Sequence, residues 1–230
     1  MRLGTHVLLL FALSFLQEDP EVFKNSFFGL RIPEFSVEEV TMREALAELS
    51  RYGIRICYEE APLPETGEQV RFSIQNQDVS ILGLLRQLVG ADPRYTFQFP
   101  RGLWYPAVNV FPVATLMDPE YLMNLQVEEL HLEVNNSTNS VYRVLREIQW
   151  RIPELRDRLP PPSTVVGSWI SGAPGGPVDV NMEFTFRNMT IRELLTELIL
   201  RSDAEEGWWF IPEPKPRWDV FPPARTEKSP

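Results

Sequence analysis

Two patterns of apolar and polar residues recur along this chain: short stretches of strict alternation, and stretches with apolar residues three and four positions apart. The first pattern is typical of half-buried β-strands and the second of amphipathic helices. They occur together most clearly in 35–49 (FSVEEVTMREALAEL) and 184–198 (FTFRNMTIRELLTEL), which align without a gap. The identical pairs are Phe35/Phe184, Thr41/Thr190, Arg43/Arg192, Glu44/Glu193, Leu46/Leu195, Glu48/Glu197 and Leu49/Leu198. This internal repeat predicts a duplicated strand-then-helix unit.

A helix start is encoded in both copies of the repeat. Thr41 and Thr190 stand before the helical spacing, and a glutamate follows each of them three residues later. In such a capping box, the Thr and Glu side chains satisfy backbone N–H groups that a helix start leaves unpaired. We therefore expect helices to begin directly after Thr41 and Thr190.

Two further segments have the same strand-then-helix pattern. In one, a strand at 70–74 precedes a helix capped by Ser80, with apolar residues Ile81, Leu84, Leu85, Leu88 and Val89. In the other, a strand at 127–134 precedes a helix capped by Asn139 or a neighbouring Ser or Thr, with apolar residues Val141, Val144, Leu145 and Ile148. Each of the four units is followed by a further strand, predicted at 54–58, 95–99, 164–170 and 208–211.

The four units group into two modules of one plan. The first module spans 30–112 and the second spans 125–222, and they end in the matching sequences NVFP and DVFP. We expect an α+β fold of two tandem small modules, each built from two strand-helix-strand units with two helices packed on short β-sheets. The matching ends indicate that the two modules have separate sheets rather than one continuous sheet.

Proline marks the segments that connect or interrupt these modules. The predicted linker is 113–124, in which Asp118-Pro119-Glu120 resembles a short helix start with Pro at the first helical position. The second module carries a Pro/Gly-rich insertion at 153–177, which cannot form continuous helix or sheet. We expect it to be a long exposed excursion, either functional or a tolerated insertion. The tail at 223–230 is predicted to be disordered.

Residues 1–16 have the character of a signal peptide. Arg2 gives a positive start, the apolar stretch at 7–13 is too short for an ordinary membrane span, and Ala12 and Ser14 are small residues suited to cleavage. No later apolar stretch is long enough to span a membrane. The sequence therefore predicts an exported protein that is periplasmic or secreted, and soluble in its mature form.

Composition and charge narrow the chemistry. The 230 residues carry a formal net charge of −10, and Lys and Arg do not cluster, so nucleic acid is not expected as a partner. The chain has one cysteine, Cys57, and two histidines, His6 and His131, which are too few for a disulfide framework or a Cys/His zinc site. No motif for a phosphate, a metal or a cofactor is present. Cys57 is expected to be a small buried apolar residue.

Adjacent carboxylates and tryptophans are the remaining candidates for a site. Neighbouring carboxylates point in different directions on a strand or helix and are expected to be solvated; these pairs are Glu38-Glu39, Glu59-Glu60, Glu128-Glu129 and Glu205-Glu206. If 208–211 is a strand, one of Trp208 and Trp209 must face away from the core. Tryptophan is favoured at interaction hot spots, and the predicted partner-binding residues are Trp169, Trp104, Trp209 and Trp218.

The first module resembles the secretin and TonB short N-terminal domain. The resemblance rests on 40–49 (VTMREALAEL) and 53–58 (GIRICY), followed by 70–74 (VRFSI), 84–90 (LLRQLVG) and 95–97 (YTF). It covers the first module almost end to end, and 180–210 of the second. It implies non-enzymatic periplasmic docking and signalling modules that hold partners at exposed sheet edges and helix faces. The chain looks like a tandem of this module without the barrel or secretin pore that usually follows it.

The leading hypothesis is an exported adaptor of the bacterial cell envelope that binds a protein partner by adding a strand to an exposed sheet edge. A second hypothesis is a periplasmic protein that binds glycan or peptidoglycan through exposed tryptophans. A third is an enzyme with an unrecognised site, which the scarcity of histidine disfavours but which carboxylate chemistry leaves open.

Overall fold

The computed structural model describes residues 29–64, 67–100, 107–135, 148–159, 181–201, 207–212 and 216–221. It confirms an α+β fold of helices and short sheets. The predicted signal peptide at 1–16, the predicted strand at 164–170 and the tail at 223–230 lie outside the described residues. Within the described ranges, no helix is long and apolar enough to cross a membrane.

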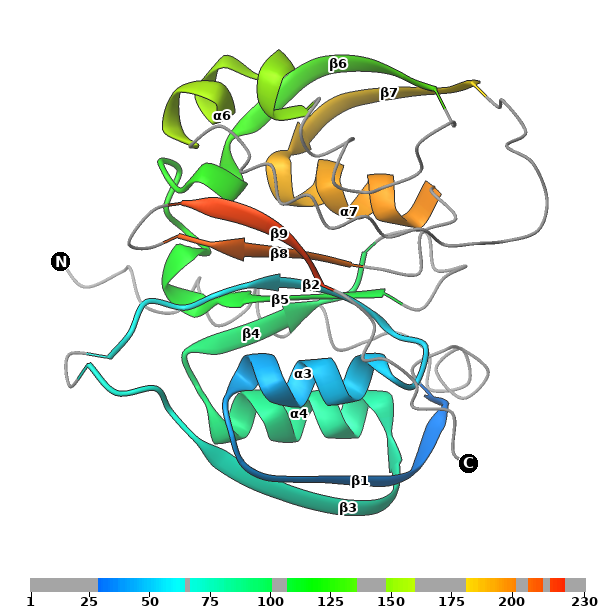
Figure 1. Ribbon diagram of the computed structural model, residues 1–230, viewed down its shortest axis with the longest axis vertical. Coiled ribbons are helices and arrows are strands. Elements are labelled where there is room, and N and C mark those ends of the chain that lie inside the picture. The colour runs from blue at the N-terminus through cyan, green and yellow to red at the C-terminus, as the bar shows by residue number, and fades with distance from the viewer. Residues whose placement is uncertain are drawn as a thin grey trace, which may run out of the picture.

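The elements are stacked in layers (Figure 1). Their bounds are β1 Arg31–Val40, α3 Met42–Ser50, β3 Phe72–Ser80, α4 Ile81–Ala91, β6 Gln126–Asn135, β7 Asn181–Thr190 and α7 Ile191–Arg201. At the bottom of Figure 1, β1 and β3 pair antiparallel as a two-stranded ribbon beneath α3 and α4. At the top, β6 and β7 form the corresponding antiparallel ribbon above α7. A central sheet separates the two helix layers.

The central sheet contains strands from both halves of the chain. Its bounds are β2 Arg55–Glu59, β4 Tyr95–Gln98, β5 Ala107–Pro112, β8 Gly207–Ile211 and β9 Arg217–Phe221, in the order β4-β5-β2-β8-β9. β2 lies in the middle and pairs parallel with both β5 and β8. The expectation of separate sheets was wrong, because β8 of the second module occupies the edge of β2 that the first module by itself would leave open.

Two hydrophobic cores lie on opposite faces of this sheet. Ile56 and Tyr58 of β2 belong to the core of the first module, together with residues of α3 and α4. Cys57 belongs to the core of the second module, together with Trp208 and Phe210 of β8. Successive side chains of a strand point to opposite faces. The alternation along β2 therefore supplies both cores, and the prediction of a buried Cys57 is confirmed.

The helix starts predicted at Thr41, Ser80 and Thr190 are confirmed, whereas the one predicted at Asn139 or a neighbouring Ser or Thr lies outside the described residues. The Thr41 backbone N–H donates to the Glu44 carboxylate (2.8 Å), and the Glu44 N–H donates to the Thr41 hydroxyl (3.4 Å). Thr190 and Glu193 repeat this capping box at the start of α7, with distances of 2.9 and 3.2 Å. Ser80 caps α4 by accepting from the Gly83 N–H (3.0 Å).

A further local feature repeats at these three starts. Two residues before each cap, the backbone adopts a left-handed conformation, with φ of +49° at Glu39, +51° at Asp78 and +50° at Asn188. Asp and Asn adopt this conformation more readily than most residue types, but glutamate, which stands at position 39, does not. The recurrence shows that each strand turns into its helix through the same backbone geometry.

The structure corrects two predictions about the connecting segments. Asp118-Pro119-Glu120 does not start a helix, because the Asp118 side chain accepts from the Glu120 N–H (2.9 Å) and closes a turn. The linker instead contains two 3-10 turns, η3 (Val113–Thr115) and η4 (Leu122–Asn124). The insertion was expected to be exposed, but it begins with a helix, α6 (Pro153–Arg158), whose Leu155 is buried in the second core. Proline at the first helical position loses no hydrogen bond. Residues 160–180 are outside the described ranges.

Close approach of β2 and β8 requires glycine at position 207. A Cβ atom at Gly207 would lie 1.7 Å from the Ile56 carbonyl oxygen. We predict that Gly207→Ala lowers the free energy of unfolding by about 1–3 kcal/mol, because a backbone atom cannot move aside as a side chain can. Urea denaturation followed by circular dichroism measures this change.

The matched control is Gly90→Ala in α4, where a Cβ would meet nothing within 4 Å. This substitution is expected to raise stability by about 0.5–1 kcal/mol, since alanine is the better helix former. Equal stabilities of the two variants would contradict the tight β2–β8 contact.

Candidate functional site

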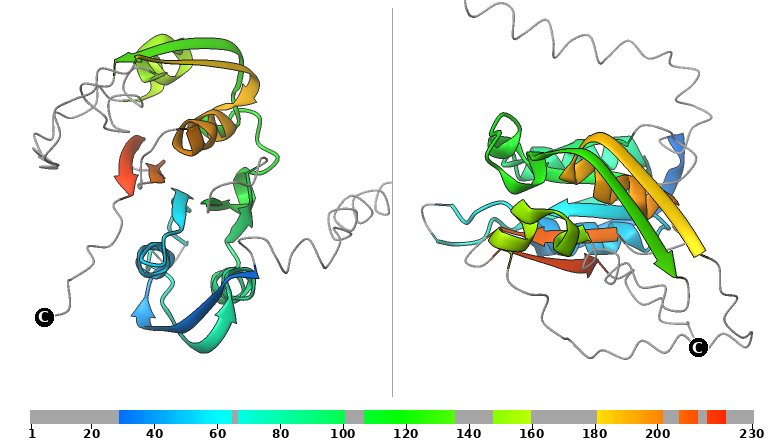
Figure 2. Two further views of the ribbon diagram at one scale, coloured as in Figure 1. Left: turned by 90° about the vertical axis from the view of Figure 1, so that its right-hand side faces the viewer. Right: turned by 90° about the horizontal axis from the view of Figure 1, so that it is seen from above.

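The two segments most alike in sequence meet at the centre of the molecule. The unit β1-α3-β2 and the unit β7-α7-β8 place their last strands side by side and parallel, with Tyr58 opposite Trp209. α3 covers one face of the central sheet and α7 covers the other (Figure 2, left). The repeat is therefore arranged as two related halves about the β2–β8 pair. We call the contacts across this pair the module junction.

Arg192 of α7 reaches across the module junction to a carboxylate of β2. Its Nη2 atom lies 3.0 Å from Oε2 of Glu59, and its Nε atom donates to the other carboxylate oxygen. Glu59 is completely buried and Arg192 is 7 % exposed. The same guanidinium donates to the Asn124 side-chain oxygen (2.9 Å) and lies 4.2 Å from the centre of the Phe111 ring. A buried bidentate ion pair thus joins the two modules.

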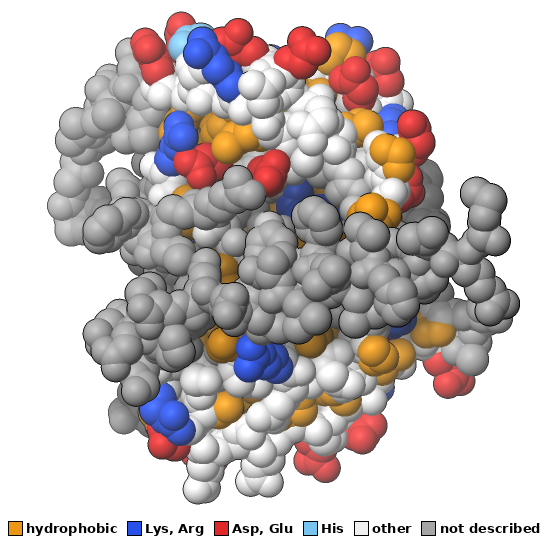
Figure 3. Space-filling view, turned by 180° about the vertical axis from the view of Figure 1, so that it is seen from behind, with side chains coloured by type: hydrophobic (Ala, Val, Ile, Leu, Met, Phe, Trp, Pro, Cys, Tyr) orange, Lys and Arg blue, Asp and Glu red, His pale blue; other side chains and the backbone are white. Residues whose placement is uncertain are grey.

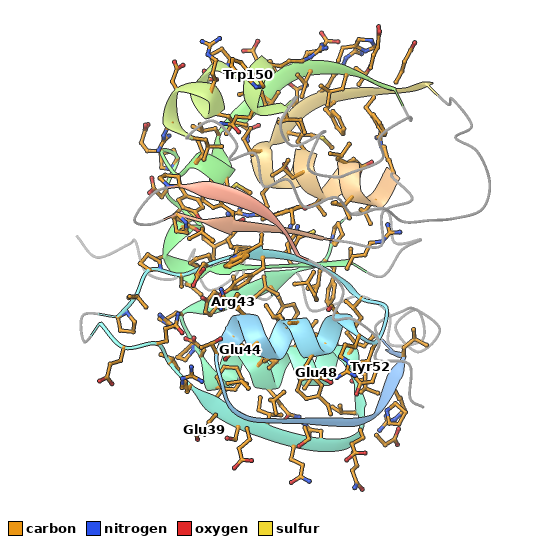
Figure 4. All side chains as sticks on the ribbon, viewed as in Figure 1. Glu39, Arg43, Glu44, Glu48, Tyr52 and Trp150 are labelled. Atoms are coloured by element: carbon orange, nitrogen blue, oxygen red, sulfur yellow. The ribbon has the colours of Figure 1, made fainter. Side chains whose placement is uncertain are left out.

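Arg43 is the repeat counterpart of Arg192 and also reaches a strand of the other module. Its guanidinium lies 4.8 Å from the centre of the Trp209 ring of β8. Figure 4 shows Arg43 at the start of α3, on the side of that helix that faces the central sheet. Each arginine of the repeat therefore contacts the other module. Arg43 contacts an aromatic ring, and Arg192 contacts an aromatic ring and a carboxylate.

Polar groups surround the buried ion pair and complete the junction. The Thr196 hydroxyl donates to the Asn109 side-chain oxygen (2.8 Å), and Arg55 donates to the Ile199 carbonyl oxygen (3.0 Å). Burial raises the pKa of the Glu59 carboxyl, and the Arg192 guanidinium opposes that shift. Burial and the nearby Glu59 carboxylate raise the pKa of Tyr121. Since both charges are enclosed, we interpret the pair as a structural contact between modules.

The prediction that the carboxylates of Glu59-Glu60 are solvated was wrong for Glu59. The alternation in β2 places Glu59 on the same face as Cys57, which the second module covers. Two sequence signals could have identified the pair: a charged residue that continues an apolar alternation, and an arginine that recurs beside the cap in both copies of the repeat. Neither signal, however, shows that Glu59 and Arg192 pair with each other.

One small hollow lies beside the start of α3. It measures about 20 Å³, enough for roughly one water molecule. Its wall includes Tyr58 and Tyr95, whose hydroxyls are 2.7 Å apart, and Arg94, whose guanidinium pairs with Asp92 (2.7 Å). The Tyr95 hydroxyl also accepts from the Ala61 N–H (2.9 Å). Among the described residues, no group of three or more His, Cys, Asp or Glu could hold a metal ion.

The edge strands offer a different kind of site. In the described part of the chain, six strands lie at a sheet edge, and only β4 (YTFQ) has no charged side chain. Charged residues and proline protect edge strands from pairing with other chains. β1 contains charged residues and a proline. Acidic side chains gather at the end of the molecule that β6 and β7 form (Figure 3). Of these six described edge strands, β4 is therefore the least protected by its own residues.

The register identifies which backbone groups of β4 face outward. The Val113 N–H donates to the Arg94 carbonyl oxygen (2.8 Å), and the antiparallel ladder with β5 continues from there. Hydrogen-bonded and non-hydrogen-bonded pairs alternate in such a ladder. Thr96 and Gln98 consequently bond to β5, whereas the N–H and C=O of Phe97 point away from it. The Phe97 ring packs half-buried against the first core and lies 5.5 Å from the Phe99 ring.

Of the four predicted tryptophans, Trp209 has its side chain within the described residues. Trp169 and Trp104 lie outside the described residues. Trp218 belongs to β9, where its backbone pairs with Phe210. Trp209 is half-buried beneath Arg43, and Trp208 is buried in the second core. Trp208 and Trp209 point to opposite faces of β8, as predicted, but Trp209 is not exposed there because it packs against the first core.

Neither family models, nor curated proteins, nor solved structures gave a match to this chain.

The two arginines of the repeat provide a matched test of the module junction. We predict that Arg192→Ala lowers the free energy of unfolding by about 3–5 kcal/mol, because it leaves the Glu59 charge buried without a partner. Arg43→Ala removes only a contact with a ring and should cost about 0.5–1 kcal/mol. Denaturant unfolding of both variants measures their free energies of unfolding. Similar losses of stability in the two variants would contradict the different roles of the two arginines.

Cys57 reports on opening of the module junction. Burial raises the pKa of its thiol to about 12, so the nucleophilic thiolate is scarce in the folded protein. We predict that a thiol reagent at mildly alkaline pH leaves the native protein unlabelled and labels it fully in denaturant. Gly207→Ala should accelerate native-state labelling more than Gly90→Ala. Rapid labelling of the parent protein would show that β2 is not enclosed as described.

Proposed function

We propose that this chain is an exported, non-enzymatic adaptor of the bacterial cell envelope that holds a protein partner by strand addition at β4. The observation that carries the proposal is the uncharged edge strand β4, with the N–H and C=O of Phe97 directed outward. Main-chain hydrogen bonds supply affinity in strand addition, and side-chain pockets supply selectivity. The half-buried rings of Phe97 and Phe99 would be covered further by an added strand.

The order of elements in the first module supports the proposed relation to secretin and TonB short N-terminal domains. The first module runs strand, helix, strand, strand, helix, strand and strand, as β1-α3-β2-β3-α4-β4-β5. The first six elements agree with the order that the resemblance implies, including the aromatic strand after the second helix, and β5 is an additional strand. Docking through sheet edges is the mode that the family resemblance implies.

Pairing between the modules limits where a partner strand can add. In the central sheet, β8 occupies one edge of β2 and β5 occupies the other. The remaining edges of that sheet among the described strands are β4 and β9. β9 carries Arg217 and Asp219, whereas β4 carries no charge. These observations favour β4 as the binding edge.

The glycan-binding alternative has less support. It relied on exposed tryptophans, yet Trp208 is buried and the Trp209 ring lies beneath the Arg43 guanidinium. Trp150 is 53 % exposed but stands apart, beside α6 at the top of Figure 4. We therefore propose no second function.

Site-specific photocrosslinking tests the β4 edge. A photoreactive residue at the exposed Gln98 of β4 should capture one defined envelope protein in intact cells. The same residue at the exposed Gln77 of β3 is the control and should not capture that protein. Capture of the same protein with equal yield from both positions would contradict binding at β4. A change of tryptophan fluorescence with peptidoglycan fragments, without any crosslink, would favour the glycan alternative.

A pair of substitutions at Phe97 separates backbone pairing from side-chain packing. Phe97→Pro removes the outward N–H while Thr96 and Gln98 retain their bonds to β5, a placement that edge strands tolerate. Phe97→Ala removes the same ring but keeps the N–H. We predict that Phe97→Pro lowers the crosslink yield from position 98 well below that of Phe97→Ala. Equal yields would show that the partner does not add a strand here.

A further inference from the structure

Four apolar side chains are exposed in the two loops that leave one end of the central sheet. They are Leu63 (55 % exposed), Val113 (44 %), Leu116 (47 %) and Met117 (88 %), which we name the strand-end patch. Leu63 follows β2 and the other three follow β5. Because β2 and β5 are adjacent and parallel, the chain leaves both at the same end of the sheet (Figure 1).

Arg94 ties the two loops of the strand-end patch together. Its guanidinium donates to the Pro62 carbonyl oxygen (3.0 Å), and its own carbonyl oxygen accepts from the Val113 N–H (2.8 Å). The Asp92 carboxylate is buried and accepts from the Arg94 guanidinium at 2.9 and 2.7 Å. The loops are thus held in place, and the charge of Arg94 is neutralised locally.

Carboxylates dominate the border of the patch. Asp118 and Glu120 are exposed in the linker directly after Met117, and Glu60 is half-buried directly after β2. Against them stands Arg158, whose guanidinium donates to the Glu120 carbonyl oxygen (3.0 Å). The border is therefore acidic, in agreement with the net charge of −10.

We propose that the strand-end patch binds a cationic amphipathic segment of a protein partner. Exposed apolar side chains that lie in neighbouring loops are typical of interaction sites, and an acidic border favours Lys and Arg around the apolar contact. A second copy would bring Asp118, Glu120 and Glu60 against their own counterparts, which like-charge repulsion opposes. The anionic headgroups of a membrane surface would meet the same repulsion.

This proposal does not rest on strand addition at β4. The outward backbone groups of Phe97 and the side chains of the strand-end patch are different binding elements. Substitutions at Leu116 and Met117 leave the β4 backbone unchanged, so the two surfaces can be tested separately. The patch would give the chain a second point of attachment, as an adaptor requires.

Peptide binding to the full chain tests the proposal. The probe is a dye-labelled peptide of about 18 residues, built from Leu and Lys at helical spacing, and its counterpart has Glu in place of Lys. We predict by fluorescence anisotropy that the Leu/Lys peptide binds and that the double variant Leu116→Ser/Met117→Ser weakens binding about tenfold or more. Added salt should weaken binding to the parent protein, and the Leu/Glu peptide should bind far less.

The matched control is Leu30→Ser, which removes an equally exposed leucine (57 %) near the opposite end of α4. It should leave peptide binding unchanged. Equal binding of the Leu/Lys peptide to the parent and the double variant would overturn the proposal, as would equal binding of the Leu/Glu peptide. Two other results would also overturn it: dimerisation that the double variant abolishes, or patch-dependent binding to phosphatidylglycerol vesicles.

Discussion

β2 and β8 pair parallel at the centre of the sheet, and both hydrophobic cores are built on this contact. β2 supplies Ile56 and Tyr58 to one core and Cys57 to the other, so neither core is complete without it. Gly207 allows the two backbones to approach where any side chain would collide with Ile56. The two halves of the chain therefore share one sheet and pack their helices on its opposite faces, which explains why β2 is buried on both sides.

The buried ion pair at this contact shows how duplicated residues have acquired different roles. Arg43 and Arg192 hold the same position in the repeat, yet only Arg192 meets a buried carboxylate. Desolvation of both charges offsets much of the attraction between them, so the pair adds less net stability than its geometry suggests. Its stronger effect is on the arrangement of the modules, since any other arrangement that keeps Glu59 buried leaves that charge uncompensated.

Sharing a sheet also changes which surfaces remain for partners. The edge of β2 is occupied from within the chain, and β4 becomes the uncharged edge of the combined sheet. The strand-end patch lies where β2 and β5 finish, close to β4 because Arg94 immediately precedes that strand. A partner strand at β4 and a cationic segment at the patch would contact adjoining parts of one sheet. Both surfaces belong to the first module and the linker, so they remain when β8 pairs with the other side of β2.

Local structure could be predicted from the residues alone: the capping boxes at Thr41 and Thr190, the cap at Ser80 and the alternation that makes β2 a strand. These features depend on residues within a few positions of one another. Three outcomes depend on contacts between distant parts of the fold: Glu59 is buried, Trp209 lies under Arg43, and one sheet serves both modules. Each of those outcomes requires β8 to arrive beside β2 from a distant part of the chain. Strand pairing between distant segments leaves no periodic mark in either segment, so local patterns could not reveal it.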